Sequence, residues 1–143
     1  MKKYILYAED DQDDFMLLKK AFEDVNGEIE LINVPTGYDV INYLQELDES
    51  RYPLLILMDI NMPMLDGKET WELLKIDDKF KSIPVVFFST SANPKDKSYF
   101  EKGGSEFLTK PSVYSEWLTI ANKLASYYCF LLFCGCELLI GLG

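Results

Sequence analysis

The chain contains no histidine, and this absence excludes several kinds of chemistry. Without an imidazole it cannot carry a phosphohistidine, and it cannot run a Ser-His or Cys-His nucleophilic mechanism. Cysteine is also scarce: Cys129, Cys134 and Cys136 all lie in the last fifteen residues. An odd, clustered set is not the framework of a disulfide-stapled secreted protein. The chemistry of this chain must therefore rest on carboxylates, hydroxyls and lysine.

Positive charge is in short supply, because 14 basic residues stand against 24 acidic ones and leave a net charge of -10. Such a surface repels nucleic acid phosphates and anionic membranes alike, so we expect neither as a partner. A cleavable leader is not expected either, since the first apolar run, Tyr4–Ala8, is only as long as a strand. These features favour a cytoplasmic protein.

Short apolar runs alternate with longer segments of helical period along the 143-residue chain. This alternation predicts an α/β fold, a doubly wound five-stranded parallel sheet with helices on both faces. We expect the five strands at Tyr4–Ala8, Ile29–Val34, Leu54–Met58, Val85–Phe88 and Glu106–Leu108. Helix starts are marked by Thr36 with Asp39, by Asp66 with Glu69, and by Asn93 before Pro94.

Polar side chains follow four of these strands. Asp10 and Asp11 follow the first strand, Asp59 the third, Ser89 the fourth and Lys110 the fifth. Because the carboxyl ends of parallel strands form the ligand-binding edge of such sheets, we expect these residues to meet there. Clustered carboxylates need a cation, and an oxygen-only ligand set suits Mg²⁺. The pattern predicts that Asp59 is a nucleophile toward a phosphoryl donor, assisted by Mg²⁺, Lys110 and Ser89.

Each of these residues has a plainer interpretation when it is taken singly. Asp59 could cap a helix, Ser89 could be a loop hydroxyl, and Lys110 could be a surface charge. The acidic run from residue 9 to residue 14 could be solvated surface, but it follows a buried strand and lacks the glycine and distal glutamate of a calcium loop. The coincidence of all four strand ends favours the metal site. Asp66 and Gly67 are interpreted as structural, a cap and a turn.

Four runs in one order resemble the receiver domain of bacterial two-component response regulators. They are ILYAEDD at residues 5–11, LLILMDINMPMLDG at 54–67, IPVVFFSTS at 83–91 and FLTKP at 107–111. Four motifs at the family's spacing are far more specific than any one alone. The resemblance runs from about residue 3 to about residue 125 and implies the flavodoxin-like receiver fold. The Ser-Thr-Ser run is similar to that of stand-alone receivers that partner phytochrome-type kinases.

The resemblance also assigns roles to individual residues. It implies that Asp59 is the phosphoacceptor and that Asp10 and Asp11 are the acidic pair that holds Mg²⁺. It also implies that the backbone carbonyl of Asn61 is a ligand to the metal and that Ser89 is the switch hydroxyl. Phe107 takes the place of the family's switch aromatic, and Lys110 that of its invariant lysine. The Lys110–Pro111 bond is expected to be cis. An aromatic in a strand is more often core, so the role of Phe107 rests on the family alone.

The implied function is that of a single-domain response regulator over residues 1–126. A sensor histidine kinase or a phosphotransfer protein would phosphorylate Asp59, and an unidentified downstream protein would read the face formed by the fourth helix, the fifth strand and the fifth helix. The chain would catalyse only its own phosphorylation and dephosphorylation. Two alternatives remain: a phosphatase of the haloacid dehalogenase type, which needs an Asp where this chain has Asn61, and a pseudo-receiver that works without phosphorylation.

The segment 127–143 departs from the family because it is almost wholly apolar. It is shorter than the roughly 20 apolar residues that a spanning helix needs, and Gly135 and Glu137 interrupt it. We expect an extension of the last helix that packs on the domain or on a second copy, giving a homodimer. A metal or redox site at Cys134 and Cys136 is disfavoured because a second ligand pair is lacking. A non-native end of the sequence is a further alternative.

Overall fold

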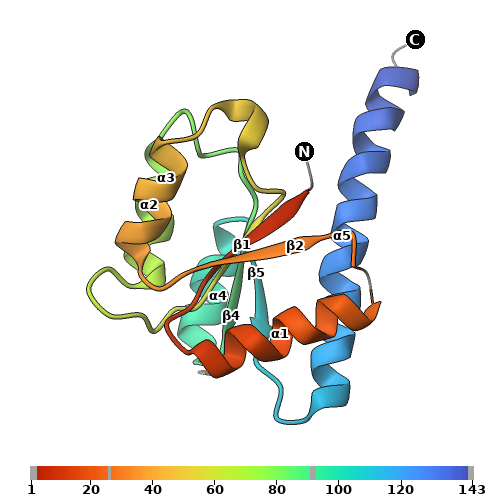
Figure 1. The fold of residues 1–143 in the computed structure, drawn as a ribbon. Coiled ribbons are helices and arrows are strands. Elements are labelled where there is room, and N and C mark those ends of the chain that lie inside the picture. Colours follow the sequence, from red (N-terminus) through yellow and green to blue (C-terminus); the bar gives the residue numbers. More distant parts are fainter. Residues whose placement is uncertain (1–2, 26, 91–92, 142–143) are drawn as a thin grey trace.

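A computed structural model describes residues 3–25, 27–90 and 93–141, with side chains as far as residue 127. Five parallel strands form one sheet in the order β2-β1-β3-β4-β5 (Figure 1). The strands are β1 (Tyr4–Ala8), β2 (Glu30–Val34), β3 (Ile56–Met58), β4 (Val85–Ser89) and β5 (Glu106–Thr109). The predicted doubly wound parallel sheet is confirmed, and β1 has the predicted bounds.

Helices connect the strands and cover both faces of the sheet. They are α1 (Gln12–Val25), α2 (Gly37–Gln45), α3 (Gly67–Ile76), α4 (Pro94–Lys102) and α5 (Tyr114–Gly141), with a 3₁₀ turn η1 at Glu49–Arg51. Helices α1 and α5 lie together on one face, and α2, α3 and α4 lie on the other (Figure 1). This two-sided cover explains why β1, β3 and β4 are buried along their whole length and read as continuous apolar runs.

The three predicted helix starts all carry the expected caps. The Thr36 hydroxyl accepts a hydrogen bond from the Asp39 N–H at the start of α2, and Asn93 caps α4 with Pro94 in its first turn. At α3, Asp66 and Glu69 form a complete capping box. Each bond satisfies a backbone donor that has no partner inside the helix. These caps fix where each helix begins, and so they set the length of the loops at the carboxyl edge of the sheet.

Two cores stabilise the sheet, one under each helical layer. On the α2, α3 and α4 side, Trp71 makes edge contacts with Phe87 and Phe100, and Phe87 stacks on Phe100 with ring centroids 3.7 Å apart. On the other side, Phe88 packs edge-on against Trp117 of α5. Aromatic pairs of this geometry add about 0.5–1.5 kcal/mol each beyond the area that they bury. The carboxyl edge is thereby held by rigid layers on both faces.

Helix α5 continues past the domain boundary that the sequence suggested, since it runs to Gly141. The prediction of a helical extension concerned residues 127–143, and the side chains beyond residue 127 lie outside the described part of the chain. The packing of the extension and the roles of Cys129, Cys134 and Cys136 therefore stay predictions. Within the part that the structure describes, no helix has both the length and the hydropathy needed to cross a bilayer.

Candidate functional site

The register of the sheet brings Glu9 and Asp59 side by side at the carboxyl edge. Ala8 pairs with Met58, and the Asp59 N–H donates to the Ala8 carbonyl at 3.1 Å, so the residue after each strand lies beside the other. The ladder also continues one residue beyond β1, because the Glu9 N–H donates to the Val34 carbonyl. Glu9 is therefore held like a strand residue, and its side chain is fully buried.

Lys110 reaches this edge from the end of β5. Its backbone N–H donates to the Ser89 carbonyl at 3.0 Å, which continues the pairing of β4 and β5. Its ammonium contacts three carboxylates: Glu9 in a short contact, Asp14 at 2.8 Å and Asp59 at 3.0 Å. An ammonium has three donors, so these contacts use all of them. No cis peptide bond occurs among the described residues, so the expectation for Lys110–Pro111 is wrong.

Asp59 is nearly buried, and both of its carboxylate oxygens are held. One oxygen accepts from the Asn61 N–H at 3.1 Å, and the other accepts from Lys110. The backbone behind Asp59 is packed against Gly67, where an added Cβ would lie 2.3 Å from the Asp59 carbonyl oxygen. The nucleophile predicted from the sequence therefore sits on a strand end that cannot shift easily, which keeps its carboxylate in one place.

Three carboxylates at this edge could hold a metal ion. Ligand atoms of Glu9, Asp10 and Asp59 all lie within 4.8 Å of one another. Oxygen Oε2 of Glu9 is buried without a hydrogen-bond partner, while Oε1 contacts Lys110. A buried, unpartnered carboxylate oxygen facing two further carboxylates is the donor set that a hard divalent cation satisfies. The residues present therefore fit a divalent metal.

Asp11 caps α1 and is not among the three carboxylates of this cluster. Its Oδ1 accepts hydrogen bonds from the backbone N–H groups of Asp13 and Asp14, at 2.9 and 3.3 Å, so it caps α1. The carboxylate cluster that could hold a metal contains Glu9 in its place. The cluster pairs Asp10 with Glu9 because the β1 ladder extends to Glu9 and α1 begins directly after Asp11, and the metal-ligand role of Asp11 stays a prediction.

Electrostatic perturbation is concentrated in the same residues. Burial raises the pKa of Glu9 to about 9, the neighbouring Asp59 carboxylate adds to the rise, and Lys110 opposes it. Burial lowers the pKa of Lys110, but hydrogen bonds to Asp14 and Glu9 outweigh it and leave that pKa above its usual value. Burial also raises the pKa of Tyr7, whose hydroxyl lies near these acids without a hydrogen-bond partner. Strongly perturbed groups gathered in one place mark a functional site.

The remaining predicted residues lie around this centre. Ser89 is fully buried at the end of β4, and Asn61 is exposed in the loop after β3. Phe107 is buried beside Phe100, with nearly parallel rings 6.4 Å apart, which is a core position. The switch roles of Ser89 and Phe107 and the carbonyl ligand role of Asn61 stay predictions. The sequence analysis noted the acidic run from residue 9 to residue 14 but assigned no role in the site to Glu9 or Asp14.

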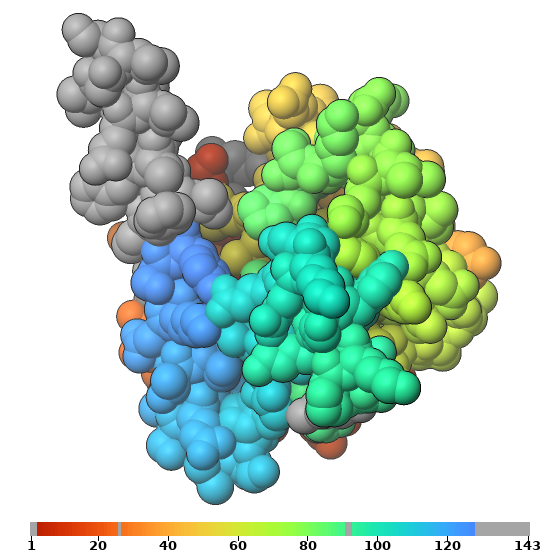
Figure 2. All heavy atoms as spheres, turned by 180° about the vertical axis from the view of Figure 1, so that it is seen from behind, coloured from red at the N-terminus to blue at the C-terminus, as the bar shows by residue number. Residues whose placement is uncertain are grey.

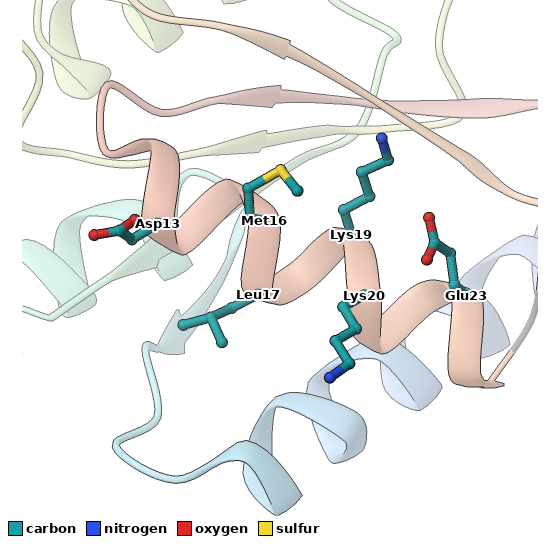
Figure 3. Close-up of a pocket in the computed structure, with 6 residues that line it drawn as sticks. All are labelled: Asp13, Met16, Leu17, Lys19, Lys20 and Glu23. Atoms are coloured by element: carbon teal, nitrogen blue, oxygen red, sulfur yellow. The ribbon is translucent and has the colours of Figure 1, made fainter.

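A solvent-open hollow lies on the outer surface of α1, next to the acidic edge (Figure 3). Met16 and Leu17 are exposed there. Two lysines and acidic residues near both ends of the helix surround them. The lining residues are Asp13, Met16, Leu17, Lys19, Lys20 and Glu23. Exposed apolar side chains surrounded by charge are typical of a surface that contacts another protein.

Comparisons with known proteins agree with the fold. Residues 5–122 match the model of the response regulator receiver domain. The response regulator Rcp1 of Synechocystis is 31% identical over 130 residues, which cover 88% of each chain. The polar-differentiation response regulator DivK of Brucella anthropi is 32% identical over 117 residues, covering 78% of this chain and 86% of DivK.

Solved structures of two response regulators are similar to this chain. The phosphorylated cyanobacterial phytochrome response regulator RcpA superposes with a TM-score of 0.79 at 29% identity, covering 90% of this chain and 95% of that one. The Mn²⁺-bound form of Rcp1 gives a TM-score of 0.77 at 30% identity, covering 88% and 94%. With its parallel sheet, its acidic edge and its family match over residues 5–122, this chain belongs to the response regulator receiver domain family of two-component signalling.

Proposed function

We propose that this chain is a response regulator that works by phosphorylation of Asp59. The observation that carries the proposal is the arrangement at the carboxyl edge, where Asp59 lies between a lysine ammonium and two further carboxylates that could share a metal with it. In the transfer, a carboxylate oxygen of Asp59 attacks phosphorus, and the bond from phosphorus to the donor's imidazole nitrogen breaks. Hydrolysis by water later restores the carboxylate. A sensor histidine kinase or a phosphotransfer protein is the donor.

We propose Mg²⁺ as the metal, held by Glu9, Asp10 and Asp59 and by the Asn61 carbonyl. When bound, Mg²⁺ would neutralise charge that develops on the transferring phosphoryl oxygens. The chain's own contribution is positional: Lys110 offers its ammonium to the same oxygens, and the Asn61 N–H fixes one oxygen of Asp59. Ser89, buried at the end of β4, supplies a hydroxyl that moves toward the phosphoryl group.

The partner surfaces follow from the same geometry. Met16 and Leu17 are exposed on α1 (Figure 3), the helix that begins shortly after Glu9 and Asp10, so they offer a docking surface to the phosphoryl donor. The signal leaves through the face formed by α4, β5 and the first turns of α5. Figure 2 shows α4 in the middle of that side of the molecule, between α3 and α5. A downstream protein would read a change in that face when Ser89 moves.

The apolar composition of residues 127–143 favours a second copy of this chain as a further partner. Sedimentation over a range of concentrations measures this. A mass that doubles with concentration supports the homodimer, and a monomer at every concentration contradicts it.

Intact-mass spectrometry after incubation with acetyl phosphate tests the proposed function. We expect one added phosphoryl group that requires Mg²⁺ and is lost in Asp59→Asn, while the exposed Asp78→Asn serves as a charge-matched control that keeps it. A folded parent protein that takes up no phosphoryl group would indicate a pseudo-receiver. Steady release of phosphate from unrelated monoesters would indicate the phosphatase alternative.

A further inference from the structure

Asp14 is the carboxylate at the acidic edge to which neither the sequence motifs nor the metal cluster gives a task. It lies in the first turn of α1, and its side chain is 21% exposed, whereas that of Lys110 is 5% exposed. Its Oδ2 lies 2.8 Å from the Lys110 ammonium, slightly closer than the Asp59 oxygen at 3.0 Å. Asp14 therefore shares the ammonium that the proposed function assigns to the phosphoryl oxygens.

The contact of Asp14 runs through Lys110 rather than through the metal position. The carboxylates that could share a metal are Glu9, Asp10 and Asp59, and Asp14 is outside that group. Its neighbour Asp13 carries the same charge on the same turn, but its side chain is exposed and lines the outer surface of α1 (Figure 3). The two residues thus separate the effect of contact with Lys110 from the effect of net charge.

We infer that Asp14 is a positioning residue that holds the Lys110 ammonium and restrains phosphorylation of Asp59. The inference rests on the proposed function. In the resting site the ammonium is divided among three carboxylates, so its charge is only partly available to an incoming phosphoryl group. Asp14 also places a negative charge at most about 6 Å from Asp59, as the two distances to Lys110 require. That charge repels an anionic donor.

An uncharged isostere at this position gives a prediction with a definite sign. In Asp14→Asn the amide oxygen still accepts from Lys110, so the ammonium stays in place while the repulsive charge is gone. Repulsion between two unit charges at about 6 Å slows a reaction by about threefold in a water-like dielectric and by about a hundredfold in the lower effective dielectric of a protein surface. We therefore expect removal of the Asp14 charge to raise the rate of phosphorylation of Asp59 by about tenfold. With acetyl phosphate as the donor, a bond forms between phosphorus and an oxygen of Asp59, the bond between phosphorus and the acetate oxygen breaks, and acetate leaves.

The experiment compares full-length Asp14→Asn with full-length Asp13→Asn. The rate of adduct formation is measured by intact mass against acetyl phosphate concentration at saturating Mg²⁺, and the small donor makes the docking surface irrelevant. We expect the second-order rate constant of Asp14→Asn to exceed that of Asp13→Asn about tenfold. We expect Asp14→Glu, which keeps the charge, to restore the slow parental rate. Loss of this nearby negative charge should also weaken Mg²⁺ binding in Asp14→Asn by about tenfold relative to Asp13→Asn, so each variant is compared at its own saturating Mg²⁺ concentration.

Three results would overturn the inference. Equal rate constants for the two Asn variants in a parent that is phosphorylated would remove Asp14 from the reaction and leave the proposed function intact. Mg²⁺ binding in Asp14→Asn that is weakened far beyond about tenfold would make Asp14 a metal ligand instead. A parent that takes up no phosphoryl group would overturn the proposed function, and this inference with it. Thermal unfolding of each variant confirms that the compared proteins are folded.

Discussion

Replacing Glu9 with glutamine should stabilise the protein in the absence of metal. Glu9 is fully buried, and one of its oxygens has no hydrogen-bond partner. Its carboxylate faces that of Asp59, and a single ammonium compensates both. A glutamine keeps the shape and still accepts from Lys110, while its amide can donate toward Asp59. The substitution therefore removes an ionisable group whose charge is unfavourable at this buried position, without removing the packing.

The size and pH dependence of this effect follow from the pKa of Glu9. Burial raises that pKa from 4.5 to about 9. The folded state then binds a proton that the unfolded state lacks between these values, so stability is highest below the lower pKa and falls as pH rises toward the upper one. At pH 7, the part of the shift that lies between pH 4.5 and pH 7 corresponds to about 3 kcal/mol, and coupling to Lys110 makes about 1–3 kcal/mol the expected range. Glu9→Gln should be stabilised by that amount and should lose the pH dependence.

Urea unfolding at pH 6 and at pH 8, with and without Mg²⁺, measures both parts of the prediction. A metal binds the charged carboxylate, so Mg²⁺ should stabilise the parent more at the higher pH and should stabilise Glu9→Gln little. Glu23→Gln, an exposed substitution on α1, is the matched control and should behave like the parent. A Glu9→Gln protein that is less stable than the parent without metal, or that keeps the full response to Mg²⁺, would refute the reasoning.

Two adjacent residues at the start of α3 should respond differently to alanine. Gly67→Ala places a Cβ 2.3 Å from the Asp59 carbonyl oxygen and 2.9 Å from the Ile60 Cα, so we expect a loss of about 1–3 kcal/mol in unfolding free energy and slower phosphorylation of Asp59. Asp66→Ala removes only the capping box of α3, so we expect a loss of about 1 kcal/mol with a phosphorylation rate close to the parent's. Urea unfolding and intact-mass kinetics on the same samples check both expectations; equal phosphorylation rates in the two variants would show that contact with the Asp59 backbone does not matter.

The sheet could be predicted from the sequence because strands buried on both faces read as uninterrupted apolar runs. Residues 4–8 and 85–88 are such runs, and the observed strands begin at the same residues. Strand β3 begins two residues later than expected, at Ile56, although the Leu54 N–H and the Leu55 carbonyl still bond to β1. Composition cannot separate such flanking residues from the regular part of a strand.

The site could be predicted only to within one residue on its acidic side. Three acids in succession follow β1, and their order alone does not say which carboxylate turns toward β3. Which carboxylate turns toward β3 depends on the pairing of Ala8 with Met58 and on the capping of α1 by Asp11. Neither feature can be predicted from the neighbouring residues alone. The period of two along β1 was a usable signal, because Ile5 and Tyr7 share a core and Glu9 follows at the same spacing.

Asp14 was beyond sequence reasoning for a different reason. Its contact with Lys110 joins residues 96 positions apart and depends on how the first turn of α1 is placed above the end of β5. An acid in the first turn of a helix is ordinarily explained by the helix dipole, so no local pattern pointed to the lysine. Long-range placement of this kind follows from the fold as a whole.

Locating the phosphoryl group tests the central claim most directly. The parent protein is treated with acetyl phosphate and Mg²⁺, the acyl phosphate is reduced with borohydride, and the resulting homoserine is located by tandem mass spectrometry of peptides. Homoserine at position 59, formed only with Mg²⁺, is the result we predict. Homoserine at position 10, 11 or 14 with an unmodified Asp59, or modification that does not depend on Mg²⁺, would contradict the claim that Asp59 is the phosphoacceptor of this site.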